Sequence, residues 1–423
     1  GQYLTGPLAH RGFDAAFITE TLLLGDLGVW GLLTGVAGTT IAAFVLFGST
    51  LLFTGAGQTF MDLAIRIAGR SRGGAAKIAT IASGLFGTIS GSAVANVATT
   101  GNFTIPLMQR LRYPSNFAAA VEAVASTGGQ IAPPIMGAAA FVMAEIIGVS
   151  YAQIMVAAIL PAILFYLGVF LTVHIAAVRM GLPLVPEDEL PSWSAVLTVA
   201  RLFPIVVAFA ALLTGIFSGR SVQTSAFWGI ISLFLSHLIL RVRSTDDLRS
   251  TGKLIFDALE DAGRTLVLIG ILLIGAQILV SLINMTGVGV ALSSYLASAA
   301  GSSTFLLAGL VGAICLILGM GIPTTAAYVL VASVLAPALT TVGISAIAAH
   351  MFVFYFATIS VITPPVCIAV FVASGIAKTP WLPTALESCK LAAVTYVIPF
   401  LFLIYPGMLA EGSWQQILDA AAS

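Results

Sequence analysis

Charged residues are scarce in this sequence. Only 8% of the 423 residues are Asp, Glu, Lys or Arg, whereas 59% are hydrophobic. Soluble globular domains contain about 25% charged residues, so this composition excludes an ordinary soluble protein. The formal net charge is +0, so the chain also lacks the excess of basic residues that nucleic-acid binding requires. We therefore predict an all-α polytopic protein that is embedded in a lipid bilayer and does not bind nucleic acid.

Cysteines and enzyme motifs are equally scarce. The three cysteines, Cys315, Cys367 and Cys389, all stand in apolar runs, where a cysteine packs as a small core residue and not as a disulfide partner or metal ligand. The sequence contains no G-x-S-x-G motif, no H-E-x-x-H motif and no pair of intramembrane aspartates. An intramembrane enzyme needs a nucleophile with a base, or paired acids. We therefore expect no catalytic residue, no cofactor and no metal other than a coupling Na⁺, and we keep an intramembrane enzyme only as a distant alternative.

Helix-breaking residues, in contrast, are concentrated in a few places. The first half of the chain reads G-T-I-S-G-S-A-V-A-N over 87–96 and S-T-G-G-Q-I-A-P-P over 126–134. Glycine allows backbone turns that other residues disfavour, and proline removes an amide donor, so both runs interrupt a helix. A bilayer tolerates an interrupted helix only where its freed backbone groups are buried in protein or line a watery cavity. We therefore expect the two breaks to form a binding site.

A second copy of this pattern lies far downstream. It reads L-G-M-G-I-P-T-T over 318–325 and A-T-I-S-V-I-T-P-P over 357–365. In the first copy Gly91 precedes the Pro-Pro pair by 42 positions (133 − 91), and in the second Gly321 precedes it by 43 (364 − 321). Close helix packing also uses small residues, but it does not require two copies at matching spacing. Interrupted segments in corresponding positions of two halves predict the binding site of a secondary transporter.

Basic residues indicate how the two copies are oriented. Lys and Arg flank both ends of the predicted hairpin over 76–112, and by the positive-inside rule both ends then face the cytoplasm. The flanks of the second predicted hairpin, over 303–339, carry no Lys or Arg, so we place it on the outer side. The two repeats then have inverted topology, which is the arrangement of many transporters.

The same reasoning divides the whole chain. Each repeat is expected to hold an interfacial arm, a re-entrant hairpin, a broken transmembrane helix and a crossing span. The predicted divisions are a lead-in and first scaffold span over 1–58, repeat 1 over 59–179, a divider loop with two scaffold spans and a cytoplasmic amphipathic helix over 180–264, repeat 2 over 265–410 and a tail over 411–423. The broken spans are predicted over 115–147 and 342–377, and the crossing spans over 151–178, 265–283 and 391–408.

The breaks carry groups that suit both a cation and an anion. Unwound carbonyls and hydroxyl or amide oxygens coordinate hard cations such as Na⁺, whereas the N-terminus of a half-helix attracts an anion. The predicted sodium-binding residues are Ser90, Gly91, Asn96, Gly128, Gly319, Gly321, Thr358 and Thr363. The predicted substrate-binding residues, between the two sodium sites, are Ser92, Thr127, Gln130, Thr325 and Ser360.

Glu122 and Arg201 are charged residues within predicted spans. Glu122 precedes the first break; it either carries a proton during transport, since intramembrane carboxylates are functional candidates, or pairs with Arg110 or Arg112 at the cytoplasmic rim. We favour the pairing. Arg201 stands at the start of a scaffold span, where we expect its long side chain to reach the interface and not the substrate.

Three long motifs carry a resemblance to a known family. They read G-T-I-S-G-S-A-V-A-N-V-A-T-T-G, E-A-V-A-S-T-G-G-Q-I-A-P-P-I-M-G-A-A-A-F and L-G-M-G-I-P-T-T-A-A-Y. In these motifs, and over roughly Leu27 to Met408, the chain resembles the large membrane subunit (permease) of TRAP transporters. The resemblance favours the TAXI type, in which the small and large membrane parts are usually fused into one protein.

This resemblance implies an inverted-repeat permease that works by an elevator mechanism in a bacterial or archaeal inner membrane. It implies import of an organic acid, either a dicarboxylate or an amino-acid-like acid, driven by a cation gradient, for which we expect sodium. It also implies two partners, a periplasmic substrate-binding protein of TAXI type and a small four-helix membrane subunit or fused domain. The alternative is an elevator-type anion symporter or exchanger that needs no binding protein.

Overall fold

The computed structural model describes residues 3, 5, 9, 10, 12–241, 244–301 and 303–412, and in these residues all regular structure is helical. The predicted all-α fold class is confirmed. Helices suit a bilayer because each one satisfies its own backbone hydrogen bonds without water. The predicted tail over 411–423 lies, from residue 413 onward, outside the described residues.

Within the described ranges, five helical segments are long and apolar enough to cross a membrane. A sixth span results if a pair of helices that is bent by 66° counts as one. The five segments are Leu32–Phe53 (α2, Leu32–Val36; η3, Ala37–Ile41; α3, Ala42–Phe53), α9 (Tyr151–Arg179), α11 (Val199–Phe217), α12 (Val222–Arg241) and α13 (Thr245–Thr286). The bent pair consists of α19 (Trp381–Leu391) and the segment of η6 (Ala393–Tyr396) and α20 (Ile398–Ile404).

The remaining long helices occur twice in the same order, as an arm, a hairpin and a helix broken in the middle. The first set is α4 (Ala56–Ala68), α5 (Gly74–Ser90) with α6 (Ala93–Arg110), and α7 (Ser115–Gly128) with α8 (Ala138–Ile147). The second set is α14 (Val288–Ala300), α15 (Thr304–Gly319) with α16 (Thr324–Thr340), and α17 (Ala346–Ile359) with η5 (Ser360–Ile362) and α18 (Ile368–Ala377). The shorter elements are α1 (Ala15–Thr19), η2 (Glu20–Leu24), η4 (Glu187–Glu189), α10 (Trp193–Val196) and η7 (Pro406–Leu409).

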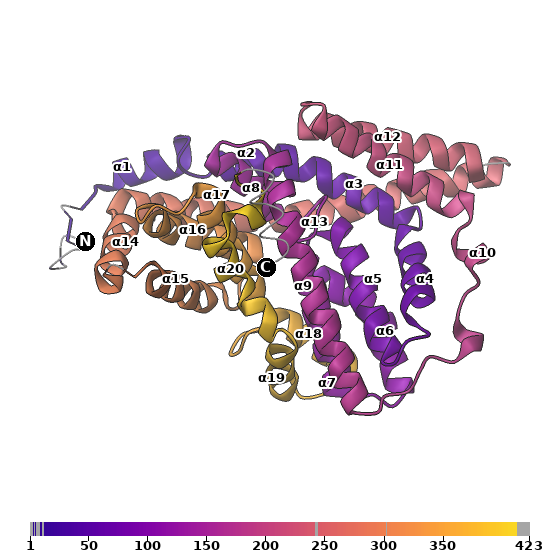
Figure 1. Cartoon of the computed structure of the whole chain (residues 1–423). Helices are drawn as coiled ribbons and strands as arrows, with labels where there is room; N and C mark the ends of the chain where they lie inside the picture. Colours follow the sequence, from indigo (N-terminus) through magenta and orange to yellow (C-terminus); the bar gives the residue numbers. More distant parts are fainter. Residues whose placement is uncertain are drawn as a thin grey trace.

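The two repeats exchange the second halves of their broken helices. The half-helix α18 packs against α6 and α7 of the first repeat, and α8 packs against α16 and α17 of the second. In Figure 1 the second hairpin with its arm lies to the left and the first hairpin with its arm to the right, with α8, α9 and α18 between them. The alanine run of α7, Ala118 to Ala120, is fully buried, and its small side chains let neighbouring helices approach closely.

The helix α13 differs from the expectation for this part of the chain. The sequence predicts a surface helix up to residue 264 and a separate span over 265–283, but the structure has one helix of 42 residues. It begins at a capping box formed by Ser244 and Asp247 and ends at Gly287, which has a left-handed conformation. No proline stands between these ends, so the change from charged to apolar composition does not interrupt the backbone.

The last span also differs from the predicted range of 391–408. The structure starts it ten residues earlier, at Trp381, and bends it by 66° near Ala392. Pro399 stands in the first turn of α20, where its missing amide favours the start of a new helix. The apolar run therefore holds two helices at an angle and not one straight span.

The helices α11 and α12 form a tight pair along the upper edge of Figure 1. The pair contacts α3, where the ring of the fully buried Phe47 lies against Phe209 of α11 and Gly229 of α12. A Cβ atom added at Gly229 would lie 2.5 Å from the Phe47 ring. The glycine is therefore what allows this ring to fill the junction of the three helices.

We expect Gly229→Ala to destabilise the protein by about 1–3 kcal/mol, because the added methyl group overpacks the junction. The measurement is the melting temperature of the detergent-purified protein. The matched control is Gly270→Ala in α13, where an added Cβ would have no atom within 4 Å. An equal melting temperature for the two variants would contradict the packing described for Phe47.

Candidate functional site

The tip of the first hairpin lies directly on the first helix break. The helix α5 ends at Gly91, which has a left-handed conformation with φ of 61°. A Cβ atom added at Gly91 would lie 2.3 Å from the Met136 carbonyl oxygen, and one added at Gly87 would lie 2.2 Å from the Cα of Gly129. Only glycine permits this contact, because in both cases the neighbouring atom belongs to the backbone. Residues of the two predicted stretches therefore form one site.

Asn96 links the three helices that meet at this site. Its side-chain amide donates to the carbonyl oxygens of Ser83 in α5, at 2.8 Å, and Ser126 in α7, at 3.4 Å. Its amide oxygen accepts a bond from the Thr100 hydroxyl at 3.2 Å. Asn96 is fully buried, so it holds the hairpin against the broken helix from the inside.

The other predicted sodium residues of the first repeat lie next to this link. Ser90 is the last residue of α5, and its buried hydroxyl has no hydrogen-bond partner among the described residues. Gly128 ends α7, where an added Cβ would lie 2.3 Å from the Phe165 ring. An unpaired polar atom buried at a helix break is a group that a bound ion would satisfy.

The second hairpin lies on the second break in a corresponding way. The Gly321 amide donates to the Val366 carbonyl at 3.1 Å, with φ of 76° at Gly321. A Cβ atom added at Gly319 would lie 2.5 Å from the Ser360 hydroxyl oxygen. At the base of α16 the buried Thr324 hydroxyl has no partner among the described residues, as is the case for Ser90 in the first repeat.

The two threonines predicted at the second sodium site differ in how deeply their side chains are buried. The fully buried Thr358 hydroxyl donates to the Phe354 carbonyl at 2.9 Å. The half-buried Thr363 hydroxyl lies 3.0 Å from the Ile359 carbonyl and 2.7 Å from the Tyr396 hydroxyl. Thr363 is the more accessible oxygen of the two.

The predicted substrate residues do not gather on one open surface. Ser92 is exposed and accepts the bond that caps α6, and Thr325 is half-buried in the first turn of α16. Thr127, Gln130 and Ser360 are buried, and the hydroxyls of Thr127 and Ser360 donate to carbonyls of their own helices. In this structure only the two tip residues are accessible to a solute.

Tyrosines that the sequence reasoning missed satisfy the freed groups of the breaks. The Tyr151 hydroxyl lies 2.8 Å from the Pro134 carbonyl and 2.7 Å from that of Ile135. The Tyr166 hydroxyl donates to the Ala125 carbonyl at 3.1 Å. Tyr166 and Tyr396 follow the first proline of their breaks by 33 (166 − 133) and 32 (396 − 364) positions, and this repeated spacing is the signal that could have found them.

The interpretation of Glu122 as a partner of Arg110 or Arg112 is wrong. Glu122 is fully buried, and its carboxylate accepts bonds from the hydroxyls of Ser83, at 2.8 Å, Ser126, at 2.9 Å, Thr100 and Thr104. Arg110 instead pairs with Glu189. The four hydroxyls come from α5, α6 and α7, because these helices turn their small polar faces toward one another.

Arg201 also finds a partner that the sequence did not reveal. Its guanidinium lies 2.6 Å from the Asp62 carboxylate of α4, and both side chains are largely buried. The pair ties the first arm to α11. Arg201 is therefore part of a structural ion pair between these two helices.

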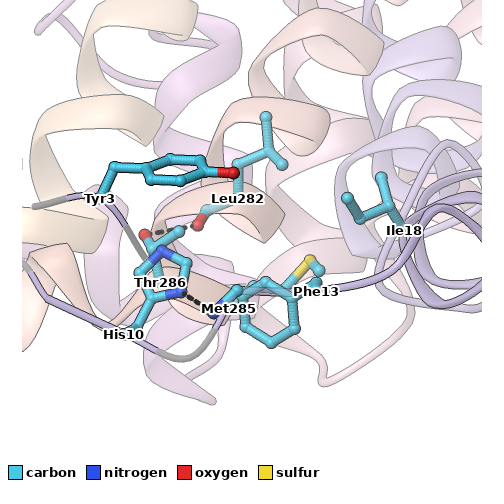
Figure 2. Close-up of a pocket in the computed structure, with 8 residues that line it drawn as sticks. Tyr3, His10, Phe13, Ile18, Leu282, Met285 and Thr286 are labelled. Atoms are coloured by element: carbon cyan, nitrogen blue, oxygen red, sulfur yellow. Dashed lines mark hydrogen bonds between the residues drawn. The ribbon is translucent and has the colours of Figure 1, made fainter. Parts of the chain in front are cut away.

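A cavity of about 300 Å³ lies far from the breaks, where the N-terminal segment meets the end of α13. Figure 2 shows its lining side chains, which include His10, Phe13 and Met285. A second cavity, of about 370 Å³, lies between α3, α4 and α13 on one side and the first hairpin on the other. Thr100 belongs to its wall, so this second cavity borders the candidate site.

The electrostatics of the site come from helix ends and not from basic side chains. No Lys or Arg occurs in the four stretches 87–96, 126–137, 318–325 and 357–367. Four helices begin at the breaks, and their positive ends favour negative charge; they are α6, α8, α16 and α18. The breaks thus combine carbonyl and hydroxyl oxygens for a cation with helix N-termini for an anion.

Comparison with known proteins places this chain in a family. Residues 17–417 match the profile of the family described as tripartite ATP-independent periplasmic transporter, DctM component. The chain is 26% identical over 400 residues to the 2,3-diketo-L-gulonate TRAP transporter large permease protein YiaN of Escherichia coli, covering 94% of this chain and 89% of that protein. It is 27% identical over 379 residues to the C4-dicarboxylate TRAP transporter large permease protein DctM of Pseudomonas aeruginosa, covering 87% of this chain and 86% of that protein.

Further relatives agree with this assignment. The sialic acid TRAP transporter large permease protein SiaM of Vibrio cholerae is 22% identical over 408 residues, with 93% of this chain and 92% of that protein covered. The crystal structure of the YdaH transporter of Alcanivorax borkumensis has the same fold, with a TM-score of 0.64 at 17% identity over 96% of this chain and 94% of that one. The chain therefore belongs to the DctM family of tripartite ATP-independent periplasmic transporters and is a multi-pass inner-membrane permease, not an enzyme.

Proposed function

We propose that this permease imports an organic acid that a soluble binding protein of the TAXI type delivers, together with a small four-helix membrane subunit or fused domain, and that an inward sodium gradient drives the uptake. The observation that carries the proposal is the contact of each hairpin tip with the helix break of its own repeat. Because the two repeats also exchange half-helices, these two contacts lie within one unit, and we propose that the substrate binds there.

Sodium is the proposed coupling ion because the oxygens that remain free at the breaks suit a hard cation. Among the described residues, the Ser90 hydroxyl has no hydrogen-bond partner and the Asn96 amide oxygen accepts only one bond. In the second repeat the half-buried Thr363 hydroxyl stands at the corresponding break. We propose one sodium site in each repeat, formed by the residues predicted from the sequence.

An organic anion is the proposed substrate for two reasons. The break regions hold no basic side chain but present the N-termini of α6 and α16 next to the accessible Ser92 and Thr325. The relatives are named for 2,3-diketo-L-gulonate, C4-dicarboxylates and sialic acid, and all three carry carboxylates. A carboxylate at these helix ends would be bound by backbone amides and hydroxyls.

An elevator mechanism fits the way in which the repeats are joined. We propose that the two hairpins and two broken helices form the transport domain, because the exchange of α8 and α18 binds them into one body. Helices α3, α11, α12 and α13 would form the scaffold, whose contacts with one another include the Phe47 junction and the packing of α13 on α3. Movement of the first body against the second would carry the bound substrate across the membrane.

The experiment that tests this proposal is uptake of labelled C4 and C5 dicarboxylates into proteoliposomes that contain the permease with its small subunit. Uptake is measured with and without an inward sodium gradient, and with and without purified binding protein. We expect uptake to require both. Uptake without the binding protein would favour the alternative of a stand-alone anion symporter, and uptake that ignores sodium would contradict the proposed coupling ion.

A second test addresses the sodium residues. We expect Asn96→Ala and Thr358→Ala to raise the sodium concentration for half-maximal uptake by about tenfold or more, as loss of groups that hold a metal ion usually does. Thr99→Ala is the matched control, since Thr99 is exposed on the same helix as Asn96. Unchanged sodium dependence in both site variants, with normal membrane insertion, would remove the proposed placement.

A third test addresses the contact between hairpin and break. In Gly87→Ala the added methyl group would meet the Gly129 backbone at 2.2 Å, and no side-chain rotation relieves a backbone clash. An overpacking cost of about 1–3 kcal/mol leads us to expect an uptake rate that is lower by about fivefold or more. Gly309→Ala in α15, where an added Cβ has no atom within 4 Å, should transport normally. Normal uptake by the Gly87 variant would show that the contact is dispensable.

A further inference from the structure

The buried carboxylate of Glu122 has no part in the proposed sodium or substrate sites. It lies within α7, six residues before Gly128 (128 − 122), and none of its surface is exposed. An ionised carboxylate is costly to bury unless a positive charge or several hydrogen bonds compensate it. The proposed sites therefore do not explain why a buried acid lies beside the first helix break.

No cation compensates this carboxylate among the described residues. On the neighbouring helices, the Lys77 ammonium bonds the Ser71 hydroxyl at 3.1 Å and lies over the Phe170 ring, and Arg110 pairs with Glu189. The four partners of Glu122 are all hydroxyls. A hydroxyl can donate to a carboxylate or accept from a carboxylic acid, so these partners do not fix the charge of Glu122.

The hydroxyl cage can satisfy both protonation states. When Glu122 is charged, all four hydroxyls can donate to it. When Glu122 is neutral, Thr100 can turn to the Asn96 carbonyl at 2.8 Å and Thr104 to the Thr100 carbonyl at 3.1 Å, and the acid proton finds an acceptor in one of the four oxygens. Neither state leaves a buried polar group unpaired, which is the condition for exchanging a proton at low cost.

A cavity borders the same threonine. Thr100 bonds Glu122 and also forms part of the wall of the 370 Å³ cavity between the first hairpin and α13. Gln58 and the half-buried Asp261 line the cavity on the opposite side. A single hydroxyl therefore separates the buried carboxylate from a space that is large enough for water.

We propose that Glu122 is a proton-binding site that exchanges its proton with this cavity through Thr100. In the loading step a hydronium ion in the cavity donates a proton to the Thr100 oxygen while the Thr100 hydroxyl proton passes to a Glu122 carboxylate oxygen. The carboxylate gains one proton, the hydronium ion becomes water, and Thr100 is unchanged. Unloading is the reverse of this transfer.

The proton site is connected to the first sodium site. Thr100 lies between Glu122 and the amide oxygen of Asn96, at 3.2 Å from the latter, and Ser126 offers its hydroxyl to Glu122 and its carbonyl to Asn96. Protonation of Glu122 therefore changes how strongly Thr100 and Ser126 hold the Asn96 link. That coupling to uptake rests on the proposed function, whereas proton binding does not.

Other titratable groups around α7 do not replace Glu122. Tyr166 of α9 is near enough to interact electrostatically with it, and the Tyr166 hydroxyl donates to the Ala125 carbonyl. Asp261 faces the cavity from α13 and accepts from the Ser49 hydroxyl at 2.7 Å. The remaining titratable side chains on the helices that contact α7 make no described hydrogen bond to Glu122; they are Lys77, Arg110, Tyr151, His174, Arg179, His350, Tyr355, Glu387, Cys389 and Lys390.

The first measurement is infrared difference spectroscopy of the reconstituted permease between acidic and alkaline buffer. We expect a carboxylic-acid C=O band that titrates with pH in the native protein, is lost in Glu122→Gln and is retained in Glu145→Gln, the matched control with an exposed glutamate in α8. The readout needs no substrate, so it decides proton binding even if the proposed transport fails. A pH-dependent spectrum that is the same in the native protein and Glu122→Gln would overturn the proposal.

The second measurement follows proton entry in proteoliposomes that hold the permease, its small subunit and a pH-sensitive dye. On addition of binding protein and dicarboxylate, we expect lumenal acidification in the native protein and a loss to the level of protein-free liposomes in Glu122→Gln. Thr100→Val should slow the acidification by about tenfold or more because it removes the relay hydroxyl, and Thr100→Ser should restore it. Native acidification rates in Thr100→Val would overturn the route through the cavity, and native rates in Glu122→Gln would overturn the site.

Discussion

An interrupted helix inside a bilayer has to find partners for its freed backbone groups within the protein, and this constraint governs the structure. The approach of Gly87 to Gly129 and the bond from Gly321 to Val366 meet it at the two hairpin tips. Water cannot serve as a partner in the hydrocarbon region, so each hairpin is held to its break by necessity. The packing of the helices around the breaks permits these contacts.

The exchange of half-helices turns two local contacts into one unit. Since α18 packs on α6 and α7, and α8 on α16 and α17, each repeat holds one half-helix of the other. The buried Asn96 and the cage around Glu122 then lie where α5, α6 and α7 converge. The residues that hold these helices together therefore include those that we propose as ligand-binding groups, and small and polar side chains line this centre of an otherwise apolar chain.

The sequence alone predicted the features that repeat along the chain. It did not predict the contacts that depend on which sides of the helices pack together. Gly91, Gly321 and the Pro-Pro pairs revealed the breaks because glycine and proline act on their own backbone. The partners of Glu122 stayed hidden, because Ser83 and Thr104 stand far from it in sequence and meet it only through packing. For the same reason the sequence did not reveal that the fold brings Asp62 to Arg201. The sequence analysis divided α13 into two helices because its composition changes from charged to apolar, although the helix itself is continuous.

The tyrosines of α9 restrict which segments of the chain can move relative to one another. Tyr151 and Tyr166 bond carbonyls of the first break at 2.7 to 3.1 Å, so α9 cannot slide along α7 and α8 without leaving those oxygens unpaired in a dry environment. Helix α9 is thereby held to the broken helix and would move together with it, although its length alone would suit a fixed span. On the C-terminal side of α9, a boundary between the moving body and the proposed scaffold would therefore lie beyond Arg179, in the proline-rich connection that leads to α11.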